Sequence, residues 1–458
     1  MQREHTLTDR RRPSTLRVAS IAGIAVGVTV LVCVLGLLLF SDPLADKFLK
    51  PRITTAIAEA YPAYSMRVGE LKYSVLGNRF AIDSVTLNAA DGSFSGRTGP
   101  FSVSGIGWMH LLWGGTLAPN DFADAVVDAH NVNLSFSAAQ YELRCELLRV
   151  SVPDSDIVVD VLALNPLGDD EQFDAGSAFR RTRFRLDVPN ARVMGAACLD
   201  LLQGEGYRAR SVHIRDLFLD VLINKEKPNA RDTSRPRMPN ELLASIEAAV
   251  QIDSLSISNG RLLYGERFVA GSAPALITLD SMQVLAEGIA NQGDSAAAVV
   301  IHARGQFMKA GTMSVLMVLP LASTEFSCQY SGSLGRMDLG VLNTFLEEAE
   351  EMRIKAGVLQ SATFDIHVAS GHASGTVRAV YRDLTVAAIN RRTGSEKGFG
   401  DGIASFIANT FKIRGTNVPD EAGLSAIGEV QYSRKRNDVF LSYAWFALRS
   451  GVGDVVGF

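Results

Sequence analysis

The stretch Val250–Glu266, VQIDSLSISNGRLLYGE, decides the fold. Leu255 and Ile257 alternate with serines in its first half, Asn259-Gly260 interrupts the alternation, and a second apolar run follows. Alternation with a period of two is typical of a β-strand with one buried face, and Asn-Gly is typical of a tight turn between two strands. The stretch therefore predicts a β-hairpin with an inner strand, a turn at Asn259-Gly260 and an outer strand.

The same form recurs along most of the chain at irregular spacing. Gly77-Asn78 separates two alternating runs, and similar strand–turn–strand units occur at Leu148–Ile157, Phe184–Val193 and, in a looser version, Met352–Leu359. Short strands at close spacing with turn signals between them indicate a mainly β, largely antiparallel sheet of repeated hairpins. Helical periodicity is limited to a few short segments, at Asn240–Val250, Val341–Glu351 and Ile403–Phe411.

Composition excludes several classes of protein. Of the 458 residues, 47% are hydrophobic and 21% are charged, which excludes a disordered chain. The formal net charge of −4 gives no reason to expect a nucleic-acid partner. Four cysteines are too few for a disulfide scaffold, so we expect buried, unpaired thiols at Cys145, Cys198 and Cys328, with Cys33 in the apolar N-terminal segment.

That N-terminal segment, Val18–Phe40, contains 23 residues without a charge. As a helix it is long enough to cross a hydrocarbon core of about 30 Å. Residues 1–17 before it carry five arginines and two acidic residues, so the positive-inside rule places this tail in the cytoplasm. A cleaved signal peptide is the alternative, but it would have a shorter apolar run followed by a small-x-small cleavage site. We therefore expect an uncleaved single-pass signal anchor at residues 18–40.

The rest of the chain divides into four expected parts. A juxtamembrane helix at residues 41–62, broken at Pro51, precedes two β regions. The N-terminal β region spans residues 63–235 and the C-terminal one spans residues 236–437, with a linker rich in proline and lysine where they meet. Residues 438–458 form the last part, an amphipathic helix.

Two expected strands, Ile157–Leu164 and Val315–Ala322, are apolar at nearly every position. One interpretation is a strand covered on both faces by helices or a second sheet. The other is a sheet whose concave face holds an apolar ligand. For the second interpretation the candidate groove residues are Val158, Val315, Met317 and Leu319.

The C-terminal helix also has two interpretations. Its apolar residues fall on one helical stripe, and Arg434, Lys435 and Arg436 stand just before it. Such a helix can close the end of the sheet, or it can dock on a membrane or a partner protein. The candidate docking residues are Leu441, Trp445, Leu448 and Val452.

Motifs that carry catalytic chemistry are missing from the sequence. There is no HExxH metal motif, no G-x-S-x-G nucleophile elbow and no Walker A loop. The seven histidines are dispersed, and the acidic stretch Asp169–Glu171 lacks the alternating oxygen ligands of a calcium loop. We therefore expect a protein that is not an enzyme and needs no cofactor or metal.

Several stretches together resemble the AsmA-like family of Gram-negative envelope proteins, related to AsmA and TamB. Met66–Leu87 is similar to the first hairpin of that family, and Val250–Glu266 is similar to its recurring strand–Asn-Gly–strand unit. Gly332–Asn343, Ile354–Leu359 and Gly375–Val386 resemble the late part of the domain. With the N-terminal anchor before them, these stretches occur in the order typical of the family.

The resemblance implies an elongated, curved sheet that forms an apolar groove, anchored in the bacterial inner membrane with its bulk in the periplasm. It implies phospholipid binding or transfer in outer-membrane or envelope biogenesis, with no catalytic residues. A bitopic scaffold or assembly factor that binds another envelope protein, or contacts the outer membrane, is the alternative hypothesis.

Overall fold

A computed structural model describes residues 63–457, apart from residues 75, 108–118, 204, 230–234, 294–296, 391, 392, 394 and 397–412. The expected cytoplasmic tail, anchor and juxtamembrane helix lie outside the described residues, as does the helix predicted at Ile403–Phe411. Within the described part of the chain, no helix is both long enough and apolar enough to cross a membrane.

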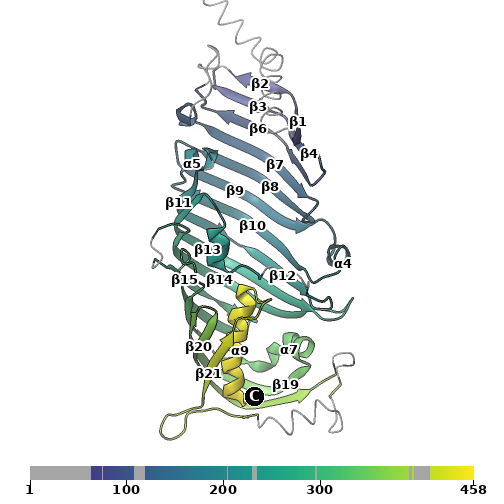
Figure 1. Cartoon of the computed structure of the whole chain (residues 1–458), viewed down its shortest axis with the longest axis vertical. Helices are drawn as coiled ribbons and strands as arrows, with labels where there is room; N and C mark the ends of the chain where they lie inside the picture. Colours follow the sequence, from purple (N-terminus) through teal and green to yellow (C-terminus); the bar gives the residue numbers. More distant parts are fainter. Residues whose placement is uncertain are drawn as a thin grey trace, which may run out of the picture.

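The described chain is mainly β, as predicted, and all 21 of its strands belong to one sheet. Figure 1 shows the strands lying across the long axis of the molecule and stacking along it. The strands of the first half are β1 (Tyr64–Val68), β2 (Leu71–Ser74), β3 (Arg79–Ile82), β4 (Val85–Ala89), β5 (Phe94–Thr98), β6 (Phe101–Ser104), β7 (Val126–Phe136), β8 (Tyr141–Ser151), β9 (Asp156–Pro166), β10 (Thr182–Met194), β11 (Gly206–Arg215) and β12 (Phe218–Asn224). Those of the second half are β13 (Ala249–Arg267), β14 (Ala275–Ala290), β15 (Val299–Phe307), β16 (Gly311–Leu319), β17 (Cys328–Leu334), β18 (Met337–Asp338), β19 (Met352–Ala369), β20 (His372–Ala388) and β21 (Ile427–Ser433).

Hydrogen bonding links the strands largely in chain order. From β2 the ladder passes through β3 and β6 to β7, then through β8, β9 and β10 to β11 and β12, and from β13 through β17 to β19, β20 and β21. The sheet is mixed rather than wholly antiparallel, because β11 and β12 both pair with β13 in parallel. The connection after β12 crosses over before β13 begins, so β13 runs in the same direction as β11 and β12.

The predicted hairpins have two different outcomes. The unit at Leu148–Ile157 is a hairpin, because β8 and β9 pair on either side of its turn. The deciding stretch Val250–Glu266 is not a hairpin: it lies within the single 19-residue strand β13. The units at Phe184–Val193 and Met352–Leu359 likewise lie within the continuous strands β10 and β19. In β13 the Asn-Gly pair is a local irregularity of one long strand.

Left-handed backbone at single residues explains that irregularity. Asn259 has a φ of 56°, and Asn131, Val161, Asp216 and Ser281 have φ values between 49° and 55° inside or between strands of the same sheet. Asn131 and Val161 flank the same position of β8, and Asp216 and Asn259 are adjacent in the parallel register. These residues therefore form a line across the middle of the sheet, and the strands that carry them locally leave the extended conformation there.

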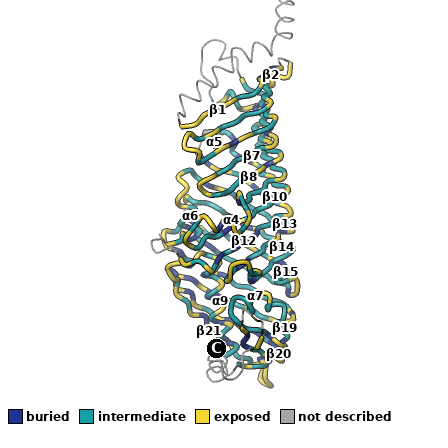
Figure 2. Tube along the Cα trace, turned by 90° about the vertical axis from the view of Figure 1, so that its right-hand side faces the viewer, coloured by how far each residue is buried: buried dark blue, intermediate teal, exposed yellow. Residues whose placement is uncertain are grey.

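The helices are short, except for the last one. They are η2 (Pro119–Phe122), α4 (Asp170–Ala175), α5 (Cys198–Gln203), α6 (Pro239–Ala244), η3 (Leu339–Leu342), α7 (Asn343–Glu350) and α9 (Phe440–Val456). α6 ends six residues before the end of the helix predicted at Asn240–Val250, because Ala249 already begins β13. Figure 2 shows α7 and α9 gathered with β19, β20 and β21 at the lower end of the sheet.

Val161 is the least favourable residue of the left-handed line, because a β-branched side chain crowds the backbone at positive φ. Its φ is 50° and its side chain is 44% exposed. Replacing it by asparagine, Val161→Asn, should raise the free energy of unfolding by about 1 kcal/mol, since the left-handed conformation costs an ordinary residue roughly 1–2 kcal/mol. Thermal unfolding of the full chain, followed by circular dichroism, measures this effect.

The matched control is Val158→Asn, in the same strand but without positive φ. That substitution should not stabilise the chain. Equal stability of wild type and Val161→Asn would contradict the strain assigned to this position.

Candidate functional site

Two rows of side chains cross nearly the whole sheet on one face, and both contain only apolar and aromatic residues. Each row passes from strand to strand through directly paired residues. Row 1 consists of Leu71, Ile82, Phe101, Ala129, Leu148, Val159, Ala191, Ile214, Ile257, Val284, Ala303, Val315, Gly332, Phe364, Val377 and Gly428. Row 2 consists of Tyr73, Phe80, Val103, Val127, Val150, Ile157, Val193, Val212, Leu255, Ala286, Ile301, Met317, Tyr330, Ile366, Gly375 and Val430. We call the face that carries these rows the apolar face.

A third row lies beyond the line of left-handed residues. This leucine row consists of Met66, Leu87, Gly96, Leu134, Leu143, Leu164, Leu186, Leu219, Leu262, Leu279, Phe307 and Gly311. It belongs to the apolar face because Phe307 and Ala303 of row 1 lie an even number of residues apart in β15, which pairs without interruption.

The left-handed residues make this arrangement possible. In β13 the row residues Leu255 and Ile257 stand at odd positions before Asn259, whereas the row residue Leu262 stands at an even position after it. Strict alternation would place the two sets on opposite faces, because side chains change face at every residue of a strand. The left-handed residue shifts the alternation by one position, so that both sets lie on the apolar face.

Protein side chains cover the apolar face at its C-terminal end. Val377, Val430, Ile366, Tyr330 and Val368 are all buried there. α9 packs on this part through Tyr443, Ala447, Gly451 and Val455, and Tyr330 donates its hydroxyl hydrogen to the Ala444 carbonyl at 3.1 Å. The large described core cluster lies wholly between Met238 and Val456.

Between the two ends of the sheet the same rows are less covered, although Ala129 of row 1 and Ala286 of row 2 are buried there. In row 1, every residue from Leu148 to Gly332 is half-buried, whereas Val377 and Gly428 are buried. The helices described beside β8 to β12 are α4 and α5, each six residues long. The other described core cluster contains only Leu71 and Tyr73, packed with Phe80 and Ile82. A continuous apolar face is thus closed by its own chain at one end and left half-exposed over much of the remainder.

The structure divides the predicted groove residues between the two faces. Val315 and Met317 lie in rows 1 and 2, and Leu319 pairs with Val299 on the same face. Val158 lies on the opposite, outer face, where it pairs with Arg149 and Arg192, so it does not share a face with the other three candidates. Where every position of a strand is apolar, the sequence does not show which residues share a face. Only the pairing register with the neighbouring strands determines which residues lie on the apolar face.

Sequence reasoning missed most of rows 1 and 2 and the whole leucine row. The signal was present around Asn259, because Leu255 and Ile257 stand at odd positions before it and Leu262 and Tyr264 at even positions after it. It was overlooked because Asn-Gly is more common in a turn between two strands. A turn would also explain why the apolar residues change from odd to even positions.

The C-terminal helix closes the end of the sheet, but not through the predicted stripe. Leu441, Trp445 and Val452 are 55%, 39% and 38% exposed. Leu448 is half-buried against the core. The buried stripe, from Tyr443 to Val455, is offset around the helix, so α9 has one apolar stripe on the sheet and a second one that faces outward.

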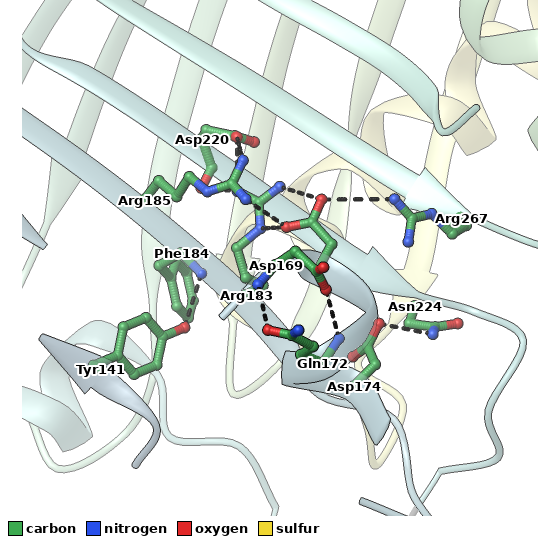
Figure 3. Close-up of polar contacts among 11 residues, drawn as sticks. Tyr141, Asp169, Gln172, Asp174, Arg183, Phe184, Arg185, Asp220, Asn224 and Arg267 are labelled. Atoms are coloured by element: carbon green, nitrogen blue, oxygen red, sulfur yellow. Dashed lines mark hydrogen bonds and ion pairs between the residues drawn. The ribbon is translucent and has the colours of Figure 1, made fainter. Parts of the chain in front are cut away.

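A group of arginines and aspartates lies on the outer face, under α4 (Figure 3). Arg183, whose side chain is 6% exposed, contacts Asp170 at 3.0 Å and Asp220 at 2.7 Å. Arg185 also contacts Asp170 at 2.7 Å, and Arg267 lies 3.6 Å from it. These ion pairs join α4 to β10, β12 and β13, and we assign them a structural role because the carboxylates already neutralise two of the three guanidinium groups.

A hollow of about 680 Å³ also lies on the outer face. Leu285, His302 and Leu316 contribute to it from adjacent strands, together with serines and Arg304. It is open to solvent and none of its polar groups is buried, so it lacks the fixed polar contacts of a specific ligand site. The apolar face is the stronger candidate, because its rows continue from strand to strand across the sheet.

The described residues contain no group of three or more side chains suited to a metal ion. Cys145, Cys198 and Cys328 are free and buried. Burial raises the pKa of all three thiols, and that of Cys328 reaches about 12. Burial also raises the pKa of the Tyr443 hydroxyl on α9, and the neighbouring Cys328 thiol adds to this effect.

No known protein-family model matches the chain, and no curated protein is similar to it in sequence.

Cys328 should be the least reactive of the three described thiols. The thiolate is the reacting form, and with a pKa of about 12 only roughly one Cys328 thiol in ten thousand is ionised at pH 8. Alkylation of the full chain with a maleimide at pH 8, followed by peptide mass spectrometry, should modify Cys145 and Cys198 before Cys328. Unfolding in urea should remove the difference. Equal rates in the folded chain would contradict the closed packing around Cys328.

Proposed function

We propose that the protein is an AsmA-like, membrane-anchored envelope protein that shields the acyl chains of phospholipids on its apolar face. The sheet would act as an open groove, anchored by residues 18–40 in the bacterial inner membrane, with its bulk in the periplasm. Its role would be phospholipid binding or transfer in envelope biogenesis, without a covalent step.

One observation carries this proposal: the chain's own core covers the apolar rows at one end, whereas over β8 to β11 every residue of both rows is only half-buried and lies outside that core. Exposed apolar surface costs about 25 cal/mol per Å². Monomeric soluble proteins rarely leave a continuous apolar patch larger than a few hundred Å². A bound apolar cover would remove this surface from water.

The chemistry of the rows favours acyl chains over a ligand of defined shape. Specific ligand sites contain a few fixed polar groups that set the orientation of the ligand. Rows 1 and 2 contain no charged residue, and Tyr73 and Tyr330 are their only residues with a polar side-chain atom. A uniform apolar row contacts every methylene of an alkyl chain equally well, so it suits interchangeable chains that can slide along it.

A scaffold or assembly factor is the second candidate. The outward stripe of α9, with Leu441, Trp445 and Val452 exposed, favours it, because exposed aromatic and aliphatic residues on a helix are typical of a docking surface. This surface is separate from rows 1 and 2, so the two candidates can be tested independently.

The test of lipid binding uses a pair of adjacent valines in β9. Val159 lies in row 1, and Val158 points to the outer face. The full chain in phospholipid vesicles is irradiated with a phospholipid that carries a diazirine on its acyl chain, and adducts are located by mass spectrometry. Val159→Asp should reduce adducts on β8, β9 and β10 about tenfold, equivalent to about 1.4 kcal/mol, because a carboxylate beside an alkyl chain loses its hydration.

Val158→Asp is the control and should leave the adducts unchanged. Circular dichroism of both variants checks that they fold. The absence of adducts on the apolar face of the wild-type chain, or equal adducts in both variants, would refute the proposal. A stoichiometric protein captured by crosslinking from Trp445, in a chain without lipid adducts, would favour the scaffold instead.

A further inference from the structure

The position of α9 suggests how the apolar face ends. Over β20 and β21, α9 lies on the same rows that are half-exposed further up the sheet. Val377 of row 1 and Val430 of row 2 are 2% and 1% exposed beneath it. The helix therefore occupies, on these two strands, the space that an apolar ligand would occupy on the others.

Glycines bring the helix backbone directly onto the sheet. A Cβ atom on Gly428 of row 1 would overlap the Gly451 carbonyl of α9. A Cβ atom on Gly451 would lie 2.6 Å from Val377 and 2.7 Å from Val430, closer than any normal carbon contact. With no side chain at either position, no space remains between helix and sheet for an alkyl chain.

The helix also covers the free edge of the last strand. The Glu429 amide of β21 donates to the Asp454 carboxylate at 2.7 Å, and the Gln431 amide donates to the Ser450 hydroxyl at 3.3 Å. An uncovered edge strand offers such amides to another strand. α9 therefore occupies both the face and the hydrogen-bonding edge of β21.

Contacts outside the sheet fix the helix along its length. Arg449 forms an ion pair at 2.7 Å with Glu350 at the end of α7. Phe326 makes edge-on contacts with Phe440 and Tyr443, at ring distances of 6.0 Å and 5.9 Å. Arg414 donates to the Val455 carbonyl near the C-terminal end of the helix. Both ends of α9 are thus held.

We propose that α9 is a built-in stop that terminates the lipid-binding face. This inference rests on the proposed function: bound acyl chains are confined to the strands before β17, and they enter and leave without passing β20 and β21. Displacing α9 would add the buried residues of rows 1 and 2 on β19, β20 and β21 to the binding face.

The experiment maps acyl contacts in the wild-type chain and in variants of α9. The probe is again a phospholipid with a diazirine on its acyl chain, added to the full chain in vesicles. Wild type should give adducts on the apolar face of β8 to β16 and none on Val377 or Val430. In Gly451→Leu, whose side chain cannot fit against Val377, adducts should spread to β20 and β21.

Cys328 reports independently whether α9 has moved, because it is buried in the same core cluster as Tyr443 of α9. Maleimide should alkylate Cys328 at least tenfold faster in Gly451→Leu than in wild type, while the rates at Cys145 and Cys198 stay unchanged. Trp445→Ala, on the outward stripe, is the matched control and should change neither readout. Deletion of residues 438–458 provides the complete displacement if leucine at position 451 is accommodated.

The outcomes separate the two proposals. A wild-type chain without any adducts refutes the lipid-binding function, and the stop with it. Wild-type adducts on Val377 or Val430 refute the stop and leave lipid binding intact. The stop is also refuted if adducts remain confined to the strands before β17 although Cys328 has become reactive. It is refuted as well if Cys328 remains unreactive after deletion of the helix.

Discussion

The structure depends on a backbone constraint: single left-handed residues in the middle of strands that otherwise alternate. In β13, Asn259 shifts the alternation by one position, and Asp216 does the same beside it. Without this shift, a strand of 19 residues with the pattern of Val250–Glu266 would bury half of its apolar residues and expose the other half. The left-handed residue thus places two short apolar stretches, one at odd and one at even positions, on the same face of the sheet.

Register then extends this local solution over the sheet. Because each strand pairs directly with its neighbour, a shift at one residue is useful only if the adjacent strands shift at the same level. Asn131, Val161, Asp216 and Asn259 lie at one level, and the strands β8 and β10 between them change the alternation at the same level without a left-handed residue. Asparagine and aspartate tolerate the left-handed region, whereas valine disfavours it. At Val161 the pairing register therefore imposes a backbone conformation that the residue itself does not prefer. The rows and the leucine row persist on both sides of the line as a result.

The sequence predicted the mainly β fold, the few short helices and a helix at the C-terminal end, because period-two alternation and a helical stripe are local signals. It did not predict the continuous strand β13 or the parallel pairing of β11 and β12 with it, since both depend on how distant segments align. Val315, Met317 and Leu319 lie on the apolar face, and Val158 does not. In a strand that is apolar at every position, only the pairing with the neighbouring strand determines which residues lie on which face. The buried stripe of α9 was missed for a related reason: alanine and glycine carry little hydrophobic signal, yet they permit the closest packing.

The contrast between the two halves of the sheet follows from what covers the same rows. At the C-terminal end, small residues of α9 and the glycine of β21 allow a helix to lie flat on the sheet, and the apolar residues beneath it become an ordinary core. Over β8 to β16, row 1 presents larger side chains such as Leu148, Ile214 and Ile257, and they are only half-buried in the described chain. The same rows therefore contribute to the core where α9 covers them, and they stay half-buried where no described helix of the chain lies on them.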